Sequence, residues 1–207
     1  MKFVIATGNA GKLKEFRAIF NNPQIEFLTL KDIGFTDDIV EDGNTFAENA
    51  TIKAKTVARF VRTKGFCEDT YVLADDSGLE VFALNGEPGI YSARYVGYHG
   101  NDDGNNIKVL QRLEETGNTE MEKRGARFFC ALAMIKASDK TEKTEIFEGE
   151  VRGHIDYKCH GTHGFGYDAI FIPQGYDTTF GELSATIKDG MSHRGNAIRL
   201  LVKFLGM

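Results

Sequence analysis

The order of apolar and polar residues predicts strands alternating with helices over the first eighty residues. Apolar runs with the length of short strands lie at 3–6, 25–30 and 71–74. Between them, apolar residues recur every three or four positions over 13–20 and 46–61, which is typical of amphipathic helices. Thr45 and Glu48 form a capping-box pattern at the start of the second helix. Strands and helices in this order predict parallel units.

The second half of the chain predicts an antiparallel hairpin. Residues 126–136 are strand-like, 138–141 can reverse the chain, and 144–151 alternate apolar with polar side chains. The other expected elements are a loop at 97–105, a helix from Ile107 to near Gly117, a strand at 169–172 and a last helix after Ser192. The pattern therefore predicts an α/β fold whose sheet is mixed.

The turn between the first strand and the first helix has the sequence Thr7-Gly8-Asn9-Ala10-Gly11-Lys12. Backbone amides and the positive end of the helix dipole point out of such a turn, and Lys12 adds a full charge. The turn is not a P-loop, because Ala6 and Leu13 stand where that motif needs Gly and Ser or Thr. These six residues alone fit an anion site and an ordinary connection with an exposed lysine equally well.

Acidic residues form the next candidate site. Asp75 and Asp76 follow a buried strand, where carboxylates are unfavourable unless they are paired, hydrogen-bonded or bound to a metal such as Mg²⁺. We interpret them as a metal or catalytic pair; the alternative is a capped strand end or an Asx-turn. Glu41 and Lys53 fit either a cation ligand with a phosphate-facing lysine, or a solvated loop before an amphipathic helix.

Two segments near the C-terminus also allow a functional and a structural interpretation. Phe165 and Tyr167 lie among glycines, where an aromatic ring can stack on a base; taken alone, the segment fits core packing better. If Ser192 caps the last helix, His193 and Arg194 lie in its first turn and oppose the helix dipole. That mismatch indicates either a nearby anionic or electron-rich ligand or a solvated surface pair.

Composition narrows the choice of partners. The chain has 207 residues, a net charge of −5 and three prolines, which is typical of one globular domain or two small lobes. The acidic balance argues against binding a nucleic-acid polymer. There is no membrane-length apolar run or signal-peptide pattern, so we expect a cytoplasmic protein. Cys67, Cys130 and Cys159 are too few and too far apart to suggest a disulfide framework or a zinc site.

Taken together, these motifs resemble the family of non-canonical purine nucleoside triphosphate pyrophosphatases, also called the inosine triphosphate pyrophosphatase or Ham1 family. The resemblance covers essentially the whole chain, with order and spacing preserved. The matching segments are 7–12, 41–53, 74–79, 88–95, 165–168 and 192–194. Ala169 departs from the family pattern, which usually has Pro after Tyr-Asp. That departure touches no motif side chain.

The resemblance implies a fold, an activity and a set of site residues. The fold is a single elongated α/β domain over 1–207, with two lobes, a long mixed sheet flanked by helices, and the active site in the cleft between the lobes. The activity is Mg²⁺-dependent hydrolysis of ITP, dITP and XTP to the monophosphate and pyrophosphate by a homodimer. Asp76 is implied as the catalytic proton acceptor and, with Glu41, as a metal ligand, and Asp75 as a further candidate ligand. The implied substrate-binding residues are Thr7, Gly8, Asn9, Ala10, Gly11, Lys12, Lys53, Ser77, Phe165, Gly166, Tyr167, Asp168, Lys188, His193 and Arg194.

Two alternatives remain beside this interpretation. A Maf-like pyrophosphatase shares the architecture but prefers other nucleotides, and the motifs at 165–168 and 192–194 argue against it. A nucleotide sensor would bind without cleaving. The pair Asp75 and Asp76 would then repel a triphosphate unless a metal were present.

Overall fold

The computed structural model describes residues 1–20, 22–65 and 69–207. Cys67 lies outside the described residues, and Cys130 and Cys159 are free thiols. The chain forms two compact units. The first contains 1–76, 130–148 and 197–207, and the second contains 77–129 and 149–196.

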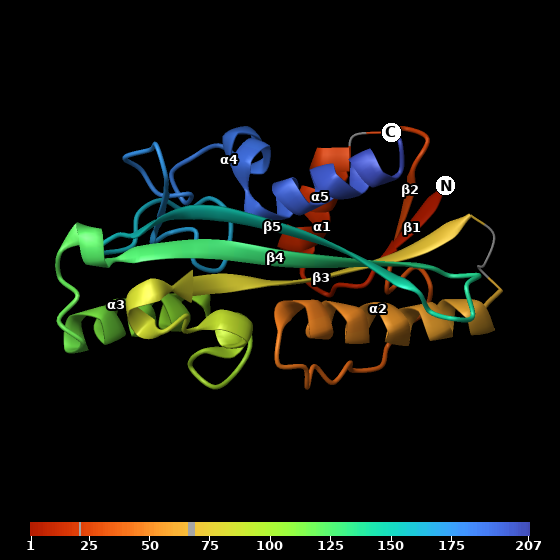
Figure 1. Ribbon diagram of the computed structural model, residues 1–207, viewed down its shortest axis with the longest axis horizontal. Helices are drawn as coiled ribbons and strands as arrows, with labels where there is room; N and C mark the ends of the chain where they lie inside the picture. Colours follow the sequence, from red (N-terminus) through yellow and green to blue (C-terminus); the bar gives the residue numbers. More distant parts are fainter. Residues whose placement is uncertain (21, 66–68) are drawn as a thin grey trace. The chain divides into compact units, whose positions relative to one another are not determined.

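One six-stranded sheet has the order β2-β1-β3-β4-β5-β6 (Figure 1). β1 (Lys2–Ile5) pairs in parallel with both β2 (Glu26–Thr29) and β3 (Thr70–Val81). β4 (Gly125–Lys136) and β5 (Thr144–Ile155) are neighbours joined by a connection too short for a parallel crossover. β6 (Phe171–Pro173) pairs antiparallel with β5. The predicted mixed sheet is therefore confirmed.

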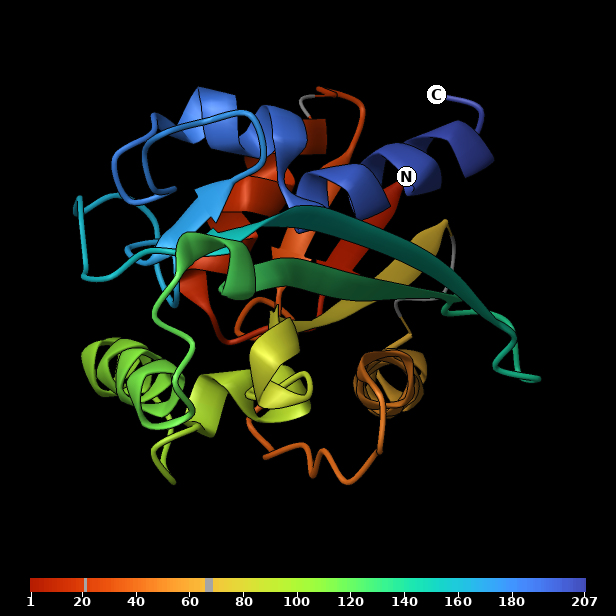
Figure 2. The ribbon, with the colours of Figure 1, turned by 60° about the vertical axis from the view of Figure 1, so that its left-hand side comes forward.

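An aromatic row sets the register of the parallel strands in the first unit. Phe3 on β1 lies opposite Phe27 on β2 and Tyr71 on β3, with ring centroids 6.1 and 5.8 Å away. Phe20 of α1 (Ala10–Phe20) packs on Phe3 at 5.3 Å. α1 and α5 (His193–Phe204) contribute to this cluster, while α2 (Phe46–Thr63) covers the opposite face (Figures 1 and 2). A one-residue slip would turn the row away from α1.

α2 begins as the capping-box pattern predicts. Thr45 is the N-cap, and its hydroxyl accepts the Glu48 N–H at 3.1 Å. The Glu48 carboxylate accepts from the N–H of Asn44 rather than that of the cap residue. The predicted apolar stripe, from Phe46 to Val61, is buried. Near its C-terminal end, α2 is held to the β4–β5 connection, because Arg59 and Arg62 both donate to Glu142.

The second unit includes parts of β3, β4 and β5, and helices pack on them. Its elements are η1 (Phe82–Leu84), η2 (Gly89–Arg94), α3 (Asp102–Glu115), η3 (Met121–Lys123), β6 and α4 (Ala185–Met191). The core joins Leu79 and Val81 of β3 to Val109 and Leu113 of α3.

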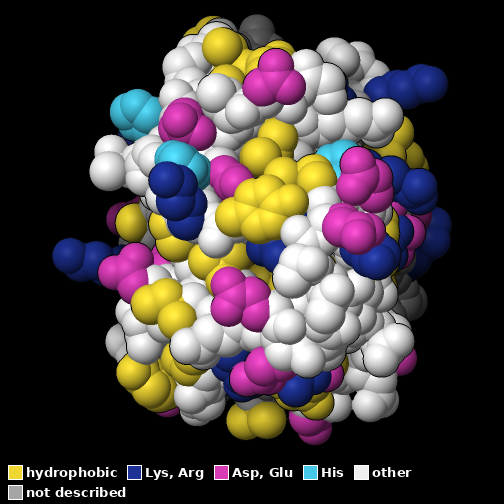
Figure 3. Space-filling model, turned by 90° about the vertical axis from the view of Figure 1, so that its left-hand side faces the viewer, with side chains coloured by type: hydrophobic (Ala, Val, Ile, Leu, Met, Phe, Trp, Pro, Cys, Tyr) yellow, Lys and Arg dark blue, Asp and Glu magenta, His cyan; other side chains and the backbone are white. Residues whose placement is uncertain are grey.

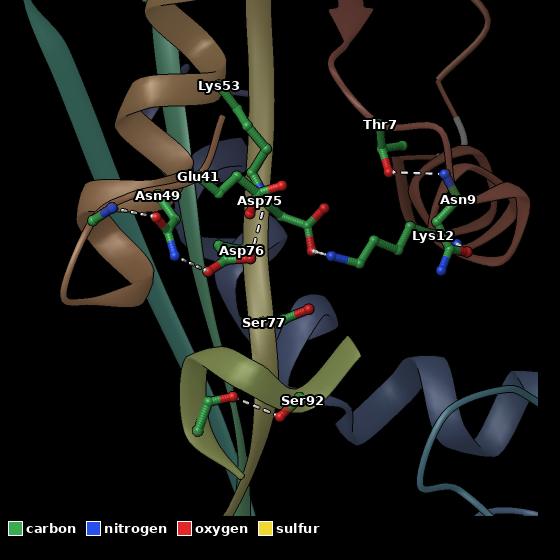
Figure 4. Close-up of polar contacts among 12 residues, drawn as sticks. Thr7, Asn9, Lys12, Glu41, Asn49, Lys53, Asp75, Asp76, Ser77 and Ser92 are labelled. Carbon is green, nitrogen blue, oxygen red and sulfur yellow. Dashed lines mark hydrogen bonds and ion pairs between the residues drawn. The ribbon is translucent and has the colours of Figure 1, made fainter. Parts of the chain in front are cut away.

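η2 packs closely on β3. The Ser92 hydroxyl donates to Gly89 O at 2.6 Å (Figure 4). It accepts from Leu79 N at 2.9 Å. A Cβ at Gly78 would lie 2.3 Å from Ser92 Oγ, so only glycine fits there.

Several boundaries differ from the sequence expectations, among them that of β5, which continues to Ile155 instead of ending at residue 151. β3 continues to Val81, so Asp75 and Asp76 lie within a strand and not at its end. α3 begins at Asp102, inside the segment expected to be a loop, because Asn101 caps it by accepting the Gly104 N–H. β6 begins at Phe171, two residues later than expected, since the preceding residues form turns.

None of the helices in the described residues is both long and apolar enough to cross a membrane. On the face drawn in Figure 3, hydrophobic side chains gather near the middle and acidic and basic side chains are interspersed around them. Among the side chains coloured there, Lys and Arg do not form the continuous patch that is typical of nucleic-acid binding.

Candidate active site

The turn before α1 is held by two local caps. Thr7 Oγ1 accepts the N–H of Asn9 at 3.1 Å, and Asn9 Oδ1 accepts the N–H of Lys12 at 3.1 Å. Because the oxygens are engaged, the Thr7 hydroxyl hydrogen and the Asn9 NH₂ are the groups that can donate to a ligand. The turn borders a cavity of about 540 Å³, whose other wall comes from residues 29–31 and 34–37.

Lys12 does not extend into solvent. Its ammonium lies 2.9 Å from Asp75 Oδ2, and only 15% of its side chain is exposed. The Asp75 side chain is fully buried. The structure therefore excludes the exposed-lysine alternative and places a buried ion pair beside the turn. Such a pair holds the lysine in one position, as a phosphate-binding group requires.

The two adjacent carboxylates point to opposite faces of β3, because successive side chains alternate along a strand. Lys12 of α1 approaches Asp75 on one face, and Lys53 of α2 approaches Asp76 on the other (Figure 4). α1 and α2, which cover opposite faces of the sheet, thus each supply one lysine to one aspartate. The arrangement places Asp75 and Asp76 in different environments, although they are neighbours in sequence.

Lys53 joins two carboxylates. Its ammonium lies 3.0 Å from Asp76 Oδ1 and 2.9 Å from Glu41 Oε2. Burial raises the pKa of Asp76 above its ordinary value, because Lys53 and Lys12 offset only part of the desolvation. Burial alone would lower the pKa of Lys53, but Asp76, Glu41 and Asp75 together hold it above its ordinary value. Lys53 is therefore cationic, and Asp76 accepts a proton more readily than an exposed aspartate.

Asn49 is a site residue that the sequence reasoning missed. Its Nδ2 donates to Asp76 Oδ2 at 3.2 Å, and its Oδ1 accepts the N–H of Gly43 at 2.9 Å (Figure 4). The buried amide thus links the carboxylate to the loop that carries Glu41. The signal that could have found it is its spacing from Lys53, four residues later on the same helix face.

The second unit holds a separate group of predicted site residues. Arg194, 1% exposed, donates from Nη2 to Ser77 Oγ at 2.7 Å. Lys188 is also buried, and its ammonium lies 2.5 Å from Asp168 Oδ2. Phe165 is half-buried, with the Lys188 ammonium 4.9 Å from its ring centroid. This group combines a flat aromatic ring with buried cationic donors, which suits a base or sugar.

His193 and Tyr167 are both buried and contact other parts of the protein interior. The His193 ring stacks on Phe128 at 4.8 Å, and Ser192 caps α5 by accepting the N–H of Gly195 at 3.0 Å. Tyr167 lies in the core, and its hydroxyl donates to Ser92 O at 2.8 Å. Burial raises its pKa well above the usual range. Tyr167 therefore follows the core interpretation, whereas Phe165 is only half-buried.

Most of the predicted site residues fall into two clusters, one in each unit, and the first cluster spans both faces of β3. The first comprises Thr7, Asn9, Lys12, Glu41, Lys53, Asp75 and Asp76, and the second comprises Ser77, Phe165, Asp168, Lys188 and Arg194. Within the described residues, no group of three His, Cys, Asp or Glu side chains could hold a metal by itself.

A parallel β-α-β unit with an N-capped lysine turn and a buried acid–lysine cluster defines an α/β protein equipped to bind phosphate. The sequence profile of the Ham1 family matches residues 3–204. The chain belongs to the Ham1 family.

The chain is similar to named enzymes and to proteins of solved structure. The dITP/XTP pyrophosphatase of Listeria monocytogenes serotype 4b (strain F2365) is 47% identical over 204 residues, which cover 99% of this chain and 94% of the relative. The dITP/XTP pyrophosphatase of Bacillus subtilis (strain 168) is 45% identical over 202 residues, which cover 98% of this chain and 96% of the relative. The solved structure of the Staphylococcus aureus Ham1 protein is 42% identical in sequence and matches with a TM-score of 0.81. The match covers 100% of this chain and 98% of that protein's chain.

Proposed function

We propose that this protein hydrolyses the non-canonical purine nucleoside triphosphates ITP, dITP and XTP to the monophosphate and pyrophosphate. The observation that carries the proposal is the buried cluster in which Lys53 bridges Asp76 and Glu41. A buried acid with a raised pKa beside fixed cations is typical of a hydrolytic site and is not required for packing. Sequence identity of 45–47% over nearly the whole chain to relatives named dITP/XTP pyrophosphatases supports the choice of substrate.

The phosphate end of the substrate requires fixed donors and positive charge. Lys12 and Lys53 supply the charge, and the turn from Thr7 to Lys12 supplies hydroxyl, amide and backbone donors. Hydrogen bonds from charged donors to phosphate are roughly twice as strong as neutral ones. Asp76, whose Oδ2 is oriented by Asn49, serves in this proposal as the proton acceptor for the attacking water.

Mg²⁺ is part of the proposal. Glu41 and Asp76 each place a carboxylate oxygen within 3.0 Å of the same lysine nitrogen, so the two acidic groups converge. Two carboxylates suit Mg²⁺, which usually takes one or two from the protein and completes its shell with water and substrate phosphates. The bound ion would neutralise charge on the phosphates. The cytoplasmic homodimer that the family resemblance implies belongs to the same proposal.

The base end requires a stacking surface and hydrogen-bond donors. Phe165 is only half-buried, and the buried cations of Lys188 and Arg194 lie 4.9 and 5.9 Å from its ring centroid. Hypoxanthine and xanthine present an acceptor oxygen at position 6, whereas adenine presents an amino donor there. Donors placed for the oxygen would leave adenine with buried unpaired groups, a mismatch that gives discrimination of about 10⁴–10⁵.

The test is steady-state pyrophosphate release from dITP, XTP, ATP and GTP at a fixed Mg²⁺ concentration. We expect high kcat/KM for dITP and XTP, a low value for ATP, and loss of activity when a chelator removes the metal. Guanine shares the acceptor oxygen at position 6, so the low kcat/KM that we expect for GTP must come from its 2-amino group. Equal kcat/KM for ATP and dITP would exclude the proposed specificity. Nucleotide binding without pyrophosphate release would favour a sensor instead.

A further inference from the structure

α3 holds the loop that presents Phe165, through residues that the proposed function does not use. The backbone N–H of Gly166 donates to Asp102 Oδ2 at 2.7 Å, and Asn106 Nδ2 donates to the Gly166 carbonyl at 3.0 Å. Asp102 and Asn106 are four residues apart and therefore lie on one face of α3. Both polar backbone groups of the residue after Phe165 are thus fixed by the same helix.

The loop is also fixed from its other side. Asp168 Oδ2 accepts the N–H of Phe165 at 2.8 Å and contacts the Lys188 ammonium at 2.5 Å. Gly166 has φ of +62°, and a Cβ at Gly164 would lie 1.9 Å from the Asp168 carboxylate. The backbone around Phe165 is therefore held by Asp168 within the loop and by α3 from outside it.

We propose that Asp102 and Asn106 are positioning residues that preorder the Phe165 ring for the purine base. This inference rests on the proposed function, in which Phe165 stacks on the base. The entropy cost of ordering the loop is subtracted from the free energy that stacking contributes to binding. A loop that is already ordered in the free protein avoids this cost, so the nucleotide binds more tightly. Neither residue touches the substrate in this proposal; both act through the backbone of Gly166.

Asp102 offers the cleaner test, because its side chain is exposed whereas Asn106 is buried. Asp102→Ala removes the acceptor for Gly166 N–H, and Asp102→Asn keeps an oxygen in its place. Asp103→Ala is the matched control, since Asp103 lies in the same first turn of α3, is also exposed and carries the same charge. Both alanine variants lose the same favourable interaction with the helix dipole.

We expect Asp102→Ala to raise the KM for dITP about tenfold with little change in kcat, the scale of losing one charge-assisted hydrogen bond. Asp102→Asn should restore most of the wild-type KM, and Asp103→Ala should match the wild type. The inhibition constant of inorganic tripolyphosphate should be the same in all four proteins, because it probes only the phosphate end. If Asp102 had a purely structural role, the KM for dITP and the inhibition constant of tripolyphosphate would rise together in Asp102→Ala.

Amide hydrogen exchange tests the same inference without activity. Asp102→Ala should speed exchange at Gly166 relative to Asp103→Ala, while exchange in the core strands stays unchanged. Equal exchange or equal KM in the two alanine variants would overturn the positioning role. If the wild type releases no pyrophosphate from dITP or XTP, the proposed function fails. Faster exchange in Asp102→Ala would then show that the loop is held but does not serve this substrate.

Discussion

Replacing Asp76 with asparagine tests the centre of the proposed mechanism. The substitution removes one charge from a buried cluster but keeps the shape of the side chain and an oxygen that can face Lys53. A general base alone contributes about 10²–10⁴ in rate, and loss of a metal-binding carboxylate adds to that. We therefore expect kcat for dITP to fall by at least about a hundredfold, with a much smaller change in KM.

The stability of the Asp76→Asn variant should change little. Burial raises the folded pKa of Asp76, so its ionisation is unfavourable for folding at pH 7, and an amide removes that cost. The same substitution removes the charge that does most to hold the pKa of Lys53 above its ordinary value, although Glu41 still pairs with that ammonium. Against this, the new NH₂ group would face Asn49 Nδ2, and two opposed donors cost about 1–3 kcal/mol. The free energy of unfolding should shift by no more than about 2 kcal/mol, or about 4–8 °C in Tm.

The assay measures pyrophosphate release and thermal unfolding on the same preparations, with Asp75→Asn as the comparison. Asp75 carries the same charge one residue earlier but pairs with Lys12 on the opposite face of β3. If Asp76 alone acts on the water, kcat falls far less in Asp75→Asn. Near-wild-type turnover in Asp76→Asn at saturating Mg²⁺ would refute the assignment. A large drop in Tm would mean that the residue is structural.

Three further predictions use other residues. Lys12→Ala should lower kcat/KM for dITP and ATP alike by about 1.5–3 kcal/mol, because both carry the same phosphates; a loss confined to one base would mean that Lys12 reads the base. Arg194→Ala should lower the ratio of kcat/KM for dITP to that for ATP, and an unchanged ratio would show that another donor discriminates. Glu142→Gln should lower the free energy of unfolding in urea by about 1 kcal/mol at pH 7, since it removes the charge and one of the two oxygens that accept from Arg59 and Arg62, and Arg59 is exposed. The hydrogen bonds from these arginines depress the pKa of Glu142 in the folded protein. The stabilisation is therefore present above the unfolded pKa of 4.5 and disappears as the pH falls through the folded pKa. A difference in unfolding free energy between the variant and the wild type that stays constant into acid would contradict this.

Local signals in the sequence determined the elements that carry the first cluster. The capping box at Thr45 and the stripe of α2 depend on interactions over three or four residues, and the structure confirms both. The polar turn from Thr7 to Lys12 between a strand and a helix is equally local, because its caps join residues two or three positions apart. Physical rules of short range therefore placed these residues correctly.

Only the tertiary structure decided which side chains meet. The sequence left it open whether Lys12 is exposed and whether Asp75 and Asp76 act together, because both depend on the length of β3 and on which helix covers each face. The division between Phe165 and Tyr167 depended in the same way on what packs around them.

Contacts between residues far apart in the sequence left no trace in the local pattern. Lys188 reaches Asp168 across 20 residues, Asn49 reaches Asp76 across 27, and Gly166 reaches Asp102 across 64. Hydrophobic periodicity records which face of an element is buried, but it does not record the partner on the other side. The sequence thus determined the elements and the polar residues that they carry, and packing of the helices against the sheet decided the pairs.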